Sequence, residues 1–405
     1  MRDTRRTLLL YYVYQTTTSN GFWMPYAYIY LLEQGHSETV FGLANAAFLF
    51  TMVAMEIPAG YIGDRYGRRT SLAIGNAIAT VVFGLYAFAG KAWQVIGLFT
   101  IWGAGYAFHS ATGEAWLYDL LAGSNGEKST ADFARDSGRS KTASLLTSAF
   151  GALAATPLYL LNPKLPFLAN AVLSVVGVPL LGLLPATRTD FEPNFSVRKA
   201  VKTLRIQIGR PTVRWLIVYI SLFNLLLSMT RWLEQPALKR AGVPLIWFGA
   251  LYASFQLVST AGTSMTGWIQ EHLGPRWFFL MLAPLVGTVY GLLAFVPAMV
   301  FPVIYLRRVL SRVMSPIMNQ YLNDQLDGGG RATVLSGASM VLTLTSGIGA
   351  AVFGPVSEAM GPLSFLPRAG IAVVSVAVLL WAVTSPVRSL EENDTDSVIK
   401  ATVDE

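Results

Sequence analysis

The chain has 405 residues, of which 53% are hydrophobic and 13% charged, and its formal net charge is +7. Soluble domains carry about 25% charged residues, so this composition argues against a water-soluble globular protein and favours lipid as the solvent. The chain lacks cysteine, which excludes a disulfide framework and a cysteine-ligated metal site.

Twelve apolar segments are long enough to cross a bilayer, which takes about 20 mostly apolar residues. The first follows Arg2, Arg5 and Arg6. It is too long for a signal-peptide core, so we expect it to remain as a transmembrane helix. The predicted spans are 8–32, 39–61, 70–90, 93–118, 141–161, 166–186, 213–235, 245–268, 277–297, 298–322, 333–357 and 363–385.

The longest polar gap lies between the sixth and seventh spans and divides the chain into two halves. Residues 197–208 in this gap place apolar residues at helical spacing among lysines and arginines, which predicts an interfacial amphipathic helix, with a soluble linker helix as the alternative. The acidic C-terminal end predicts a disordered tail. We expect a six-helix half at 1–186, a linker at 187–212, a second six-helix half at 213–386 and a tail at 387–405.

The distribution of lysine and arginine predicts the orientation. With twelve spans, 21 of the 30 basic residues fall on the side that holds the termini and 5 on the other side. Basic residues concentrate on the cytoplasmic side of membrane proteins, so we expect a multi-pass protein of the cell membrane with both termini in the cytoplasm. Because these charges are spread over short loops and form no basic face, we expect no nucleic-acid partner.

Two loops repeat one pattern 207 residues apart. The first runs from Gly60 through Asp64, Arg65, Gly67, Arg68 and Arg69, and the second runs from Gly267 through Glu271, His272, Gly274 and Arg276. Both read glycine, three residues, acid, base, any residue, glycine, any residue, arginine. The dipeptides Gly138-Arg139 and Gly330-Arg331 open the fifth and eleventh spans in the same way. The repeat predicts two related six-helix halves, a duplication typical of transporters.

The first copy of this loop matches the loop signature of the major facilitator superfamily, and the flanking text EIPAGYIGDRYGRRTSL also resembles that family. The segment GEAWLYD at 113–119 resembles a poorly characterised prokaryotic branch. The resemblance implies an all-α integral membrane fold of twelve helices in two pseudo-symmetric bundles, acting as a monomer. It also implies that Gly60, Asp64, Arg65, Gly67, Arg68 and Arg69 form a gating loop that holds the halves together in one state; the alternative is that these arginines only set topology.

Ionisable side chains inside the spans are the candidate solute-binding groups, because a charge at membrane depth is costly and usually faces a cavity. By resemblance, helices 1, 4, 7 and 10 line the central cavity, and the buried polarity falls mainly on these four; the main exceptions are Glu56 in the second span and Glu358 in the eleventh, both near span ends where water reaches. The tenth span carries three arginines, which suit an anionic group; Arg312 could instead lie at the cytoplasmic boundary. The predicted solute-binding residues are Arg307, Arg308, Arg312, Gln15, Asn20 and Asn224.

Two residues of the fourth span are the candidate proton carriers. Glu114 is a carboxyl group in a desolvated position, which can load and release protons near neutrality; a static salt bridge is the alternative. His109 is the second candidate, because the unperturbed pKa of histidine is about 6.5; the alternative is a hydrogen-bonded packing residue. Near the outer end of the seventh span, Arg231 and Glu234 lie three residues apart, where they can form an ion pair that acts as an outer gate or as a local solvated pair.

The function we expect is secondary active transport of a small organic solute by alternating access, coupled to protons and directed outward. The alternative is facilitated or ion-coupled uptake of an organic anion through the arginines of the tenth span. A non-transporting membrane receptor is the alternative from another class. The chain has no HExxH, GxSxG or GxxxxGK[ST] motif, so we expect no enzyme activity, cofactor or metal. The expected partners are the solute, the lipid bilayer and protons.

Overall fold

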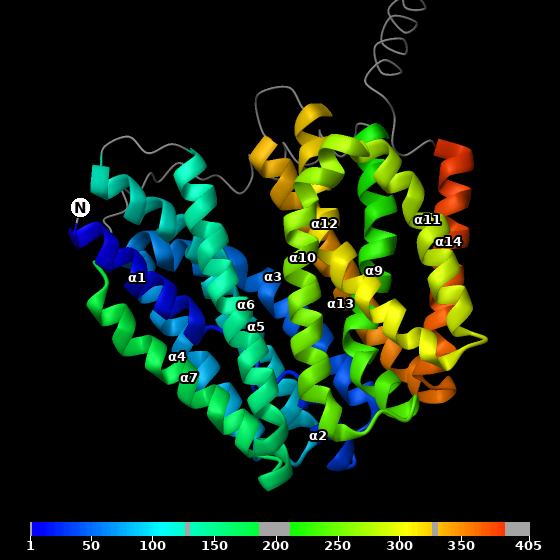
Figure 1. The fold of residues 1–405 in the computed structure, drawn as a ribbon, viewed down its shortest axis with the longest axis horizontal. Coiled ribbons are helices and arrows are strands. Elements are labelled where there is room, and N and C mark those ends of the chain that lie inside the picture. The colour runs from blue at the N-terminus through cyan, green and yellow to red at the C-terminus, as the bar shows by residue number, and fades with distance from the viewer. Residues whose placement is uncertain (1, 126–129, 186–210, 326–330, 385–405) are drawn as a thin grey trace, which may run out of the picture. The chain divides into compact units, whose positions relative to one another are not determined.

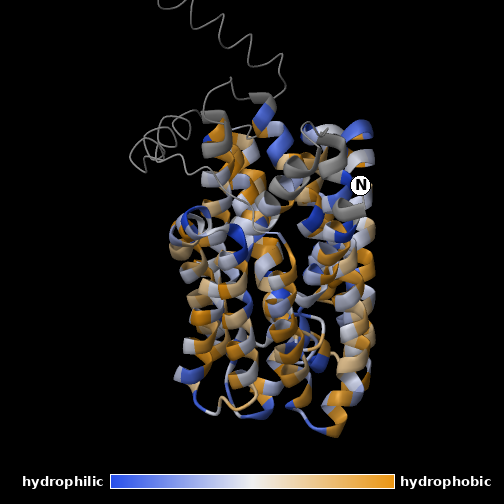
Figure 2. Ribbon diagram, turned by 90° about the vertical axis from the view of Figure 1, so that its left-hand side faces the viewer, coloured by the Kyte–Doolittle hydropathy of each residue, from blue (hydrophilic) through white to orange (hydrophobic). Residues whose placement is uncertain are grey.

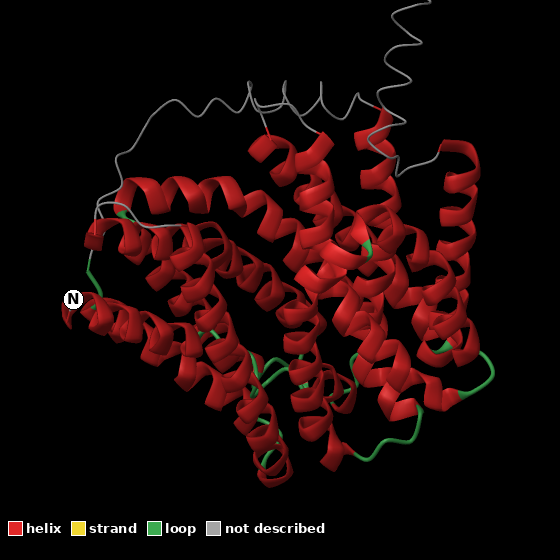
Figure 3. Cartoon of the chain, turned by 45° about the horizontal axis from the view of Figure 1, so that its top comes forward, coloured by secondary structure: helices red, strands yellow, loops and turns green. Residues whose placement is uncertain are grey.

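The computed structural model describes residues 2–125, 130–185, 211–325 and 331–384, in which helices are joined by short loops and no strand occurs (Figure 3). The predicted amphipathic helix at 197–208 and the tail at 387–405 lie outside the described residues. The elements of Figure 1 are α1 (Arg2–Thr17), α2 (Ala27–Glu33), α3 (Glu38–Tyr66), α4 (Arg68–Tyr86), α5 (Ala92–Asn125), α6 (Thr130–Leu161), α7 (Leu165–Leu183), α9 (Pro211–Arg240), η1 (Leu245–Trp247), α10 (Phe248–His272), α11 (Gly274–Leu293), η2 (Pro297–Met299), α12 (Val300–Gln325), α13 (Arg331–Met360) and α14 (Pro362–Thr384).

A helix or a pair of helices coincides with each of the twelve predicted spans. The largest difference in bounds is at the fifth span, predicted from residue 141, where α6 begins at Thr130. Hydropathy marks only the apolar part of a helix, so it missed the polar first turns of α6. Hydrophobic residues are spread along the helices in Figure 2, with hydrophilic residues gathered mainly at their ends.

By length and composition alone, eight of the described helices are apolar enough to cross a membrane: α3, α6, α7, α9, α10 with η1, α11, α13 and α14. The first span does not reach the required length because it is divided into α1 and α2. Helix α12 carries the three arginines that were predicted to bind solute. Helices α4 and α5 are likewise not among the eight.

The backbone shows the duplication that the loop pattern predicts. Gly67 and Gly274, which are 207 residues apart, both lie at the junction of two successive helices with positive φ, at 91° and 70°. Gly35 and Gly242, also 207 apart, both have φ of 83°. A residue with a Cβ avoids this region, so glycine is favoured at these helix ends. The four glycines thus mark equivalent turns in the two halves.

The chain forms two compact units that cut across the two halves. The first takes 1–193 together with 232–260 and 347–359, which are one end of α9, η1 with the first part of α10, and one end of α13. The second takes 194–231, 261–346 and 360–405. Three helices of the second half therefore contribute one end each to the unit that holds the first half.

An aromatic cluster stabilises the first unit around the break in the first span. The Trp23 ring lies 5.1 Å from Phe83 of α4 and 5.0 Å from Trp102 of α5, measured between ring centroids. Trp23 is buried. In the second unit the residues 207 positions later, Thr230 and Tyr290, are joined by a hydroxyl–hydroxyl hydrogen bond of 2.7 Å. The repeat therefore keeps the contact between these two positions while its chemistry changes.

Candidate functional site

The first transmembrane span is discontinuous: α1 ends at Thr17 and α2 begins at Ala27. The cause is local. Hydroxyls of the threonine run bond back to the chain three residues earlier, Thr17 to the Tyr14 carbonyl at 2.7 Å and Thr18 to the Gln15 carbonyl at 2.9 Å. Such side chains compete with the helical bonds of the backbone. Pro25, within the break, has no N–H to donate. We predicted this segment as one helix from 8 to 32, and the structure corrects that prediction.

The break crosses α6 with direct backbone contact. A Cβ added to Gly21 would lie 2.2 Å from the Ser148 carbonyl oxygen, so only glycine fits at this crossing. The Ser148 hydroxyl accepts a bond of 2.9 Å from Gln256 of α10. Of the two polar residues predicted here, Gln15 donates to the Tyr11 hydroxyl at 2.7 Å and Asn20 is half-buried in the break. A discontinuous helix of this kind is a common place for solute-binding groups in transporters.

At the start of α3, side chains from both halves of the sequence form a polar cluster within the first unit. Glu38 is buried. Its carboxylate accepts a short hydrogen bond from Ser357 of α13 and lies 3.6 Å from the Arg240 guanidinium at the end of α9. Glu358 accepts from both the hydroxyl of Thr39, at 2.5 Å, and its backbone N–H, at 3.2 Å. The α13 carboxylate thus satisfies a free N–H in the first turn of α3.

Three hydrogen bonds of one side chain extend this cluster toward α2. The Gln235 amide of α9 accepts from the backbone N–H groups of Tyr28 and Ile29, at 3.0 and 3.3 Å, and donates to the Met24 carbonyl at 2.6 Å. We use the term clasp for the contacts made by Glu38, Thr39, Gln235, Arg240, Ser357 and Glu358.

Small residues allow close packing beside the clasp. A Cβ on Gly42 of α3 would lie 2.6 Å from the Ala350 carbonyl oxygen and 3.0 Å from Gly354 Cα, so α3 and α13 touch through their backbones. Phe41 packs edge-on against Trp232 of α9, with ring centroids 5.6 Å apart. The clasp is therefore a polar rim on a close helix–helix contact.

The predicted gating loop lies at the other end of α3. Asp64 pairs with Arg68 at 3.4 Å, across the turn made by Gly67. Arg69 donates to the Leu184 carbonyl at 3.3 Å, just after α7. A cation at that position interacts favourably with the helix C-terminus. Arg65 is exposed, bonds the Tyr61 hydroxyl at 2.5 Å and lies over the ring of Tyr66. A Cβ on Gly60 would meet nothing within 4 Å.

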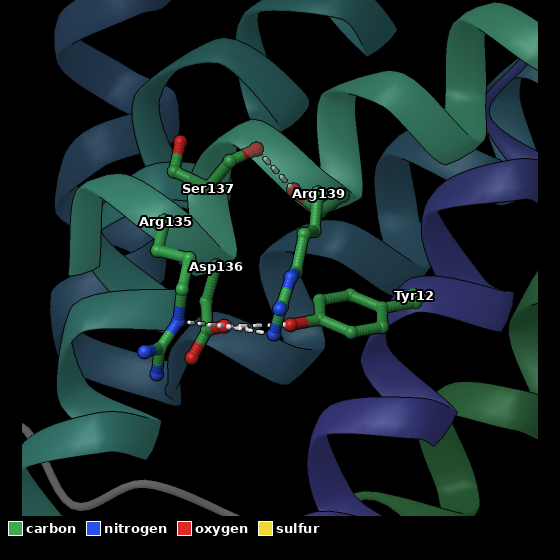
Figure 4. Close-up of polar contacts among 6 residues, drawn as sticks. Tyr12, Arg135, Asp136, Ser137 and Arg139 are labelled. Carbon is green, nitrogen blue, oxygen red and sulfur yellow. Dashed lines mark hydrogen bonds and ion pairs between the residues drawn. The ribbon is translucent and has the colours of Figure 1, made fainter. Parts of the chain in front are cut away.

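A buried carboxylate between α1 and α6 was not among the predicted site residues. Asp136 accepts a bond of 3.0 Å from the Tyr12 hydroxyl and lies 3.7 Å from Arg135 and 3.6 Å from Arg139 (Figure 4). In the close-up, Arg135 lies on one side of the carboxylate, and Arg139 and Tyr12 lie on the other. Asp136 is buried whereas both arginines are exposed. The Asp136 carboxylate therefore links α1 to a turn of α6 that carries two arginines.

The predicted solute-binding residues of the second half lie in the second unit. Asn224 of α9 donates to the Leu342 carbonyl at 3.1 Å and to the Ser346 hydroxyl at 2.8 Å, both on α13. Of the α12 arginines, Arg307 is buried at 4% exposure, Arg308 is half-buried and Arg312 is exposed. The structure thus gives the three arginines three different environments, and Asn224 joins two helices.

The candidate proton carriers lie on α5. His109 is half-buried; its Nδ1 lies 3.3 Å from the Tyr14 hydroxyl of α1, and its ring lies against the Gly75 backbone of α4. Glu114 is part of α5, but its side chain lies outside the description. On α9, Glu234 is buried and Arg231 is exposed. The proton-carrying and gating roles of these residues remain predictions.

Three clasp residues were not among the site residues predicted from the sequence, each for a different reason. Glu38 lies one residue before the predicted second span, although Ser37 before it is a typical helix cap. Glu358 was noted only as a charge near a span end. Gln235 is uncharged and directly follows Glu234. A search for polar residues at the matching ends of spans in both halves would have found them.

Comparison with known proteins identifies the family. A family model described as the Major Facilitator Superfamily matches residues 8–350. An uncharacterized MFS-type transporter of Bacillus subtilis (strain 168), YxaM, is 24% identical over 153 residues, which cover 38% of this chain and 37% of YxaM. The match thus spans little more than a third of that curated relative.

Solved structures of similar fold cover nearly the whole chain. The nucleoside transporter NupG has a TM-score of 0.73 at 12% identity, covering 94% of this chain and 97% of NupG. A bacterial homolog of the human lysosomal transporter Spinster, in an inward-facing and unoccupied conformation, has a TM-score of 0.72 at 15% identity, covering 94% and 95%. The predicted twelve-helix fold in two related bundles is confirmed, and the chain belongs to the Major Facilitator Superfamily of membrane transporters.

Proposed function

We propose that this protein is a secondary active transporter that exports a small organic solute across the cell membrane by alternating access, coupled to protons. The observation that carries the proposal is the clasp, where one end of α3 bonds side chains of α9 and α13 from the other half. A transporter of this kind needs contacts between its halves that close one entrance and can be broken again.

The chemistry of the clasp suits a reversible gate. The net contribution of a hydrogen bond to stability is about 1 kcal/mol, or about 1.5–3 kcal/mol where one partner is charged, because water binds both partners once they are separated. A large apolar side chain contributes about 1.5–3 kcal/mol on burial and gains no such replacement in water. Of the ion-paired groups, Arg240 is half-exposed, at 54% of its side-chain surface, so its pair contributes little net stability. Polar contacts to which water gains access on opening are therefore broken at low cost.

The orientation follows from the charge distribution. The gating loop with Arg65, Arg68 and Arg69 lies at one end of α3 and the clasp at the other. Because basic loops mark the cytoplasmic side, we infer that both termini lie in the cytoplasm and that the clasp lies at the outer face. The clasp then closes the outer entrance.

The likeness to solved transporters, at 12–15% identity, concerns the fold alone, so the residues of this chain itself support the solute class. Arg307 is buried at 4% exposure in mid-helix, and a permanently charged guanidinium there favours an anionic or amphipathic solute. The buried guanidinium of Arg307 also favours a second candidate function, uptake of an organic anion without proton coupling. We expect the protein to act as a monomer.

Flux measurements in liposomes separate the two candidates. A thermal-shift screen of a metabolite panel on the purified chain first selects solutes. Each is then loaded into proteoliposomes with an imposed pH gradient. The proposal predicts solute movement driven by the gradient and equal proton movement in the opposite direction, reported by a pH-sensitive dye. Flux that ignores the gradient would favour anion uptake over proton-coupled export.

The glutamate of the fourth span tests the coupling residue. Glu114→Gln should abolish gradient-driven transport and leave solute exchange across the membrane intact, because exchange needs no net proton movement. Unchanged gradient-driven transport in this variant would remove Glu114 from the mechanism.

A further inference from the structure

The start of α2 depends on another helix for its backbone hydrogen bonds. The first four N–H groups of a helix have no partner within it, and Tyr26, which precedes α2, supplies no side-chain cap. The acceptor comes from α9, where the Gln235 oxygen binds the N–H groups of Tyr28 and Ile29. The amide nitrogen of Gln235 donates to the Met24 carbonyl inside the break. One side chain thus satisfies three backbone groups on both sides of the α2 start.

The internal repeat would allow a reciprocal contact between the two halves, but only one of the two contacts can form. Gln235 lies 207 residues after Tyr28, so the contact joins equivalent positions of the two halves. The equivalent of Ile29 is Pro236, which has no N–H and cannot donate the reciprocal bond. Helix α9 also runs without interruption from Pro211 to Arg240, whereas the first span is broken at this level. The continuous helix α9 therefore caps the start of α2 in the broken first span.

The length of α2 makes the dependence strong. It has seven residues, and helices shorter than about 12 residues are marginal without tertiary support. Tyr28 and Ile29 are buried, so their N–H groups lie where an unmet hydrogen bond is costly. Withdrawal of α9 would leave two donors of α2 and the Met24 carbonyl without partners.

We propose that Gln235 is a positioning residue that couples opening of the clasp to rearrangement of the break in the first transmembrane helix. When α9 moves away, α2 loses its cap, and the segment 18–26 that contains Asn20 changes its conformation. Gate opening and remodelling of the polar segment are then one event. The role of that segment in solute binding rests on the proposed function, but the coupling itself does not.

A second glutamine provides a matched control. Gln94 of α5 accepts from the backbone N–H groups of Gly90 and Lys91, at 3.0 and 2.9 Å. It makes the same kind of cap as Gln235, with the donors and the acceptor all in the first half. Gln94→Met therefore removes an equivalent local cap without touching α9.

The test uses the full chain in lipid nanodiscs, without solute. Hydrogen–deuterium exchange measures how well the capped backbone N–H groups of Tyr28 and Ile29 are protected. Spin-label distances between Gln34→Cys and Lys239→Cys read the separation of α2 and α9; the natural chain has no cysteine, and both positions are exposed. We expect Gln235→Met to speed amide exchange of residues 24–33 about fivefold or more, as for a lost cap. We also expect it to add a longer-distance population. Gln94→Met should leave both readouts unchanged.

Gln235→Glu keeps the acceptor oxygens and should preserve the slow exchange of Tyr28 and Ile29. Unchanged exchange in Gln235→Met, or faster exchange with an unchanged distance distribution, would overturn the proposed coupling. Equal loss of protection in Gln235→Glu would also overturn it, since the acceptor would then be irrelevant. Neither measurement needs a solute or a proton gradient, so its failure is distinguishable from failure of the flux experiment.

Discussion

The close contact that Gly42 makes beside the clasp means that a single added methyl group can destabilise the closed state of the clasp. In Gly42→Ala the new Cβ would lie 2.6 Å from the Ala350 carbonyl oxygen, whereas ordinary contact begins at 3.4 Å. Helices α3 and α13 must therefore separate locally by about 0.8 Å. Overpacking of this kind costs about 1–3 kcal/mol. If the open state does not share this cost, the closed population falls about 5- to 150-fold relative to the open one.

The same substitution at Gly84 of α4, outside the clasp and the gating loop, is the control. A Cβ on Gly84 meets nothing within 4 Å, so Gly84→Ala gains helix propensity of up to about 1 kcal/mol and leaves the clasp alone. The assay is the distance distribution between spin labels at Gln34→Cys and Ala359→Cys, both exposed positions near the clasp. Gly42→Ala should add a longer-distance population that Gly84→Ala lacks. Identical distributions in the two variants would refute the argument that the close backbone contact holds the clasp shut.

Three further changes test other parts of the account. Arg69→Ala removes the charge-assisted bond to the Leu184 carbonyl and should lower the free energy of unfolding by about 1.5–3 kcal/mol, measured by thermal unfolding in detergent; an unchanged midpoint would contradict this. Asp136→Asn removes the anion that Tyr12 binds and should destabilise the protein by about 1–3 kcal/mol in the same assay, whereas equal stability would show that the carboxylate is dispensable. Arg308→Ala should weaken binding of an anionic solute at least tenfold by isothermal titration, since a charged hydrogen bond contributes about 1.5–3 kcal/mol; unaltered affinity would make Arg308 structural.

Much of the fold could be predicted because hydropathy and repetition are properties of the chain itself. The positions of the twelve spans follow from apolar length. The duplication follows from two loops 207 residues apart, which end in the positive-φ glycines Gly67 and Gly274. The break in the first span was missed because it depends on threonine hydroxyls that bond back to the chain. Apolar length alone does not register that competition.

The candidate site could be predicted only in part, because its contacts depend on which helix ends meet. Glu38 and Glu358 are 320 residues apart in sequence and lie beside each other through Ser357 and Thr39. Their adjacency follows from the packing of α3 against α13, which no local pattern encodes. Charge content singled out the arginines of α12, of which Arg307 is buried, but the chemical partners of Arg307 are set by the tertiary structure.

Reversible locking of the clasp is the most direct test of alternating access in this protein. Thr39 and Glu358 contact each other across α3 and α13, and the cysteine-free chain allows Thr39→Cys and Glu358→Cys to be joined by a short, reducible thiol cross-linker in proteoliposomes. We expect solute flux to fall to the level of protein-free liposomes when the cross-link is complete and to recover on reduction. Undiminished flux through the fully cross-linked protein would contradict a clasp that opens and closes in each transport cycle.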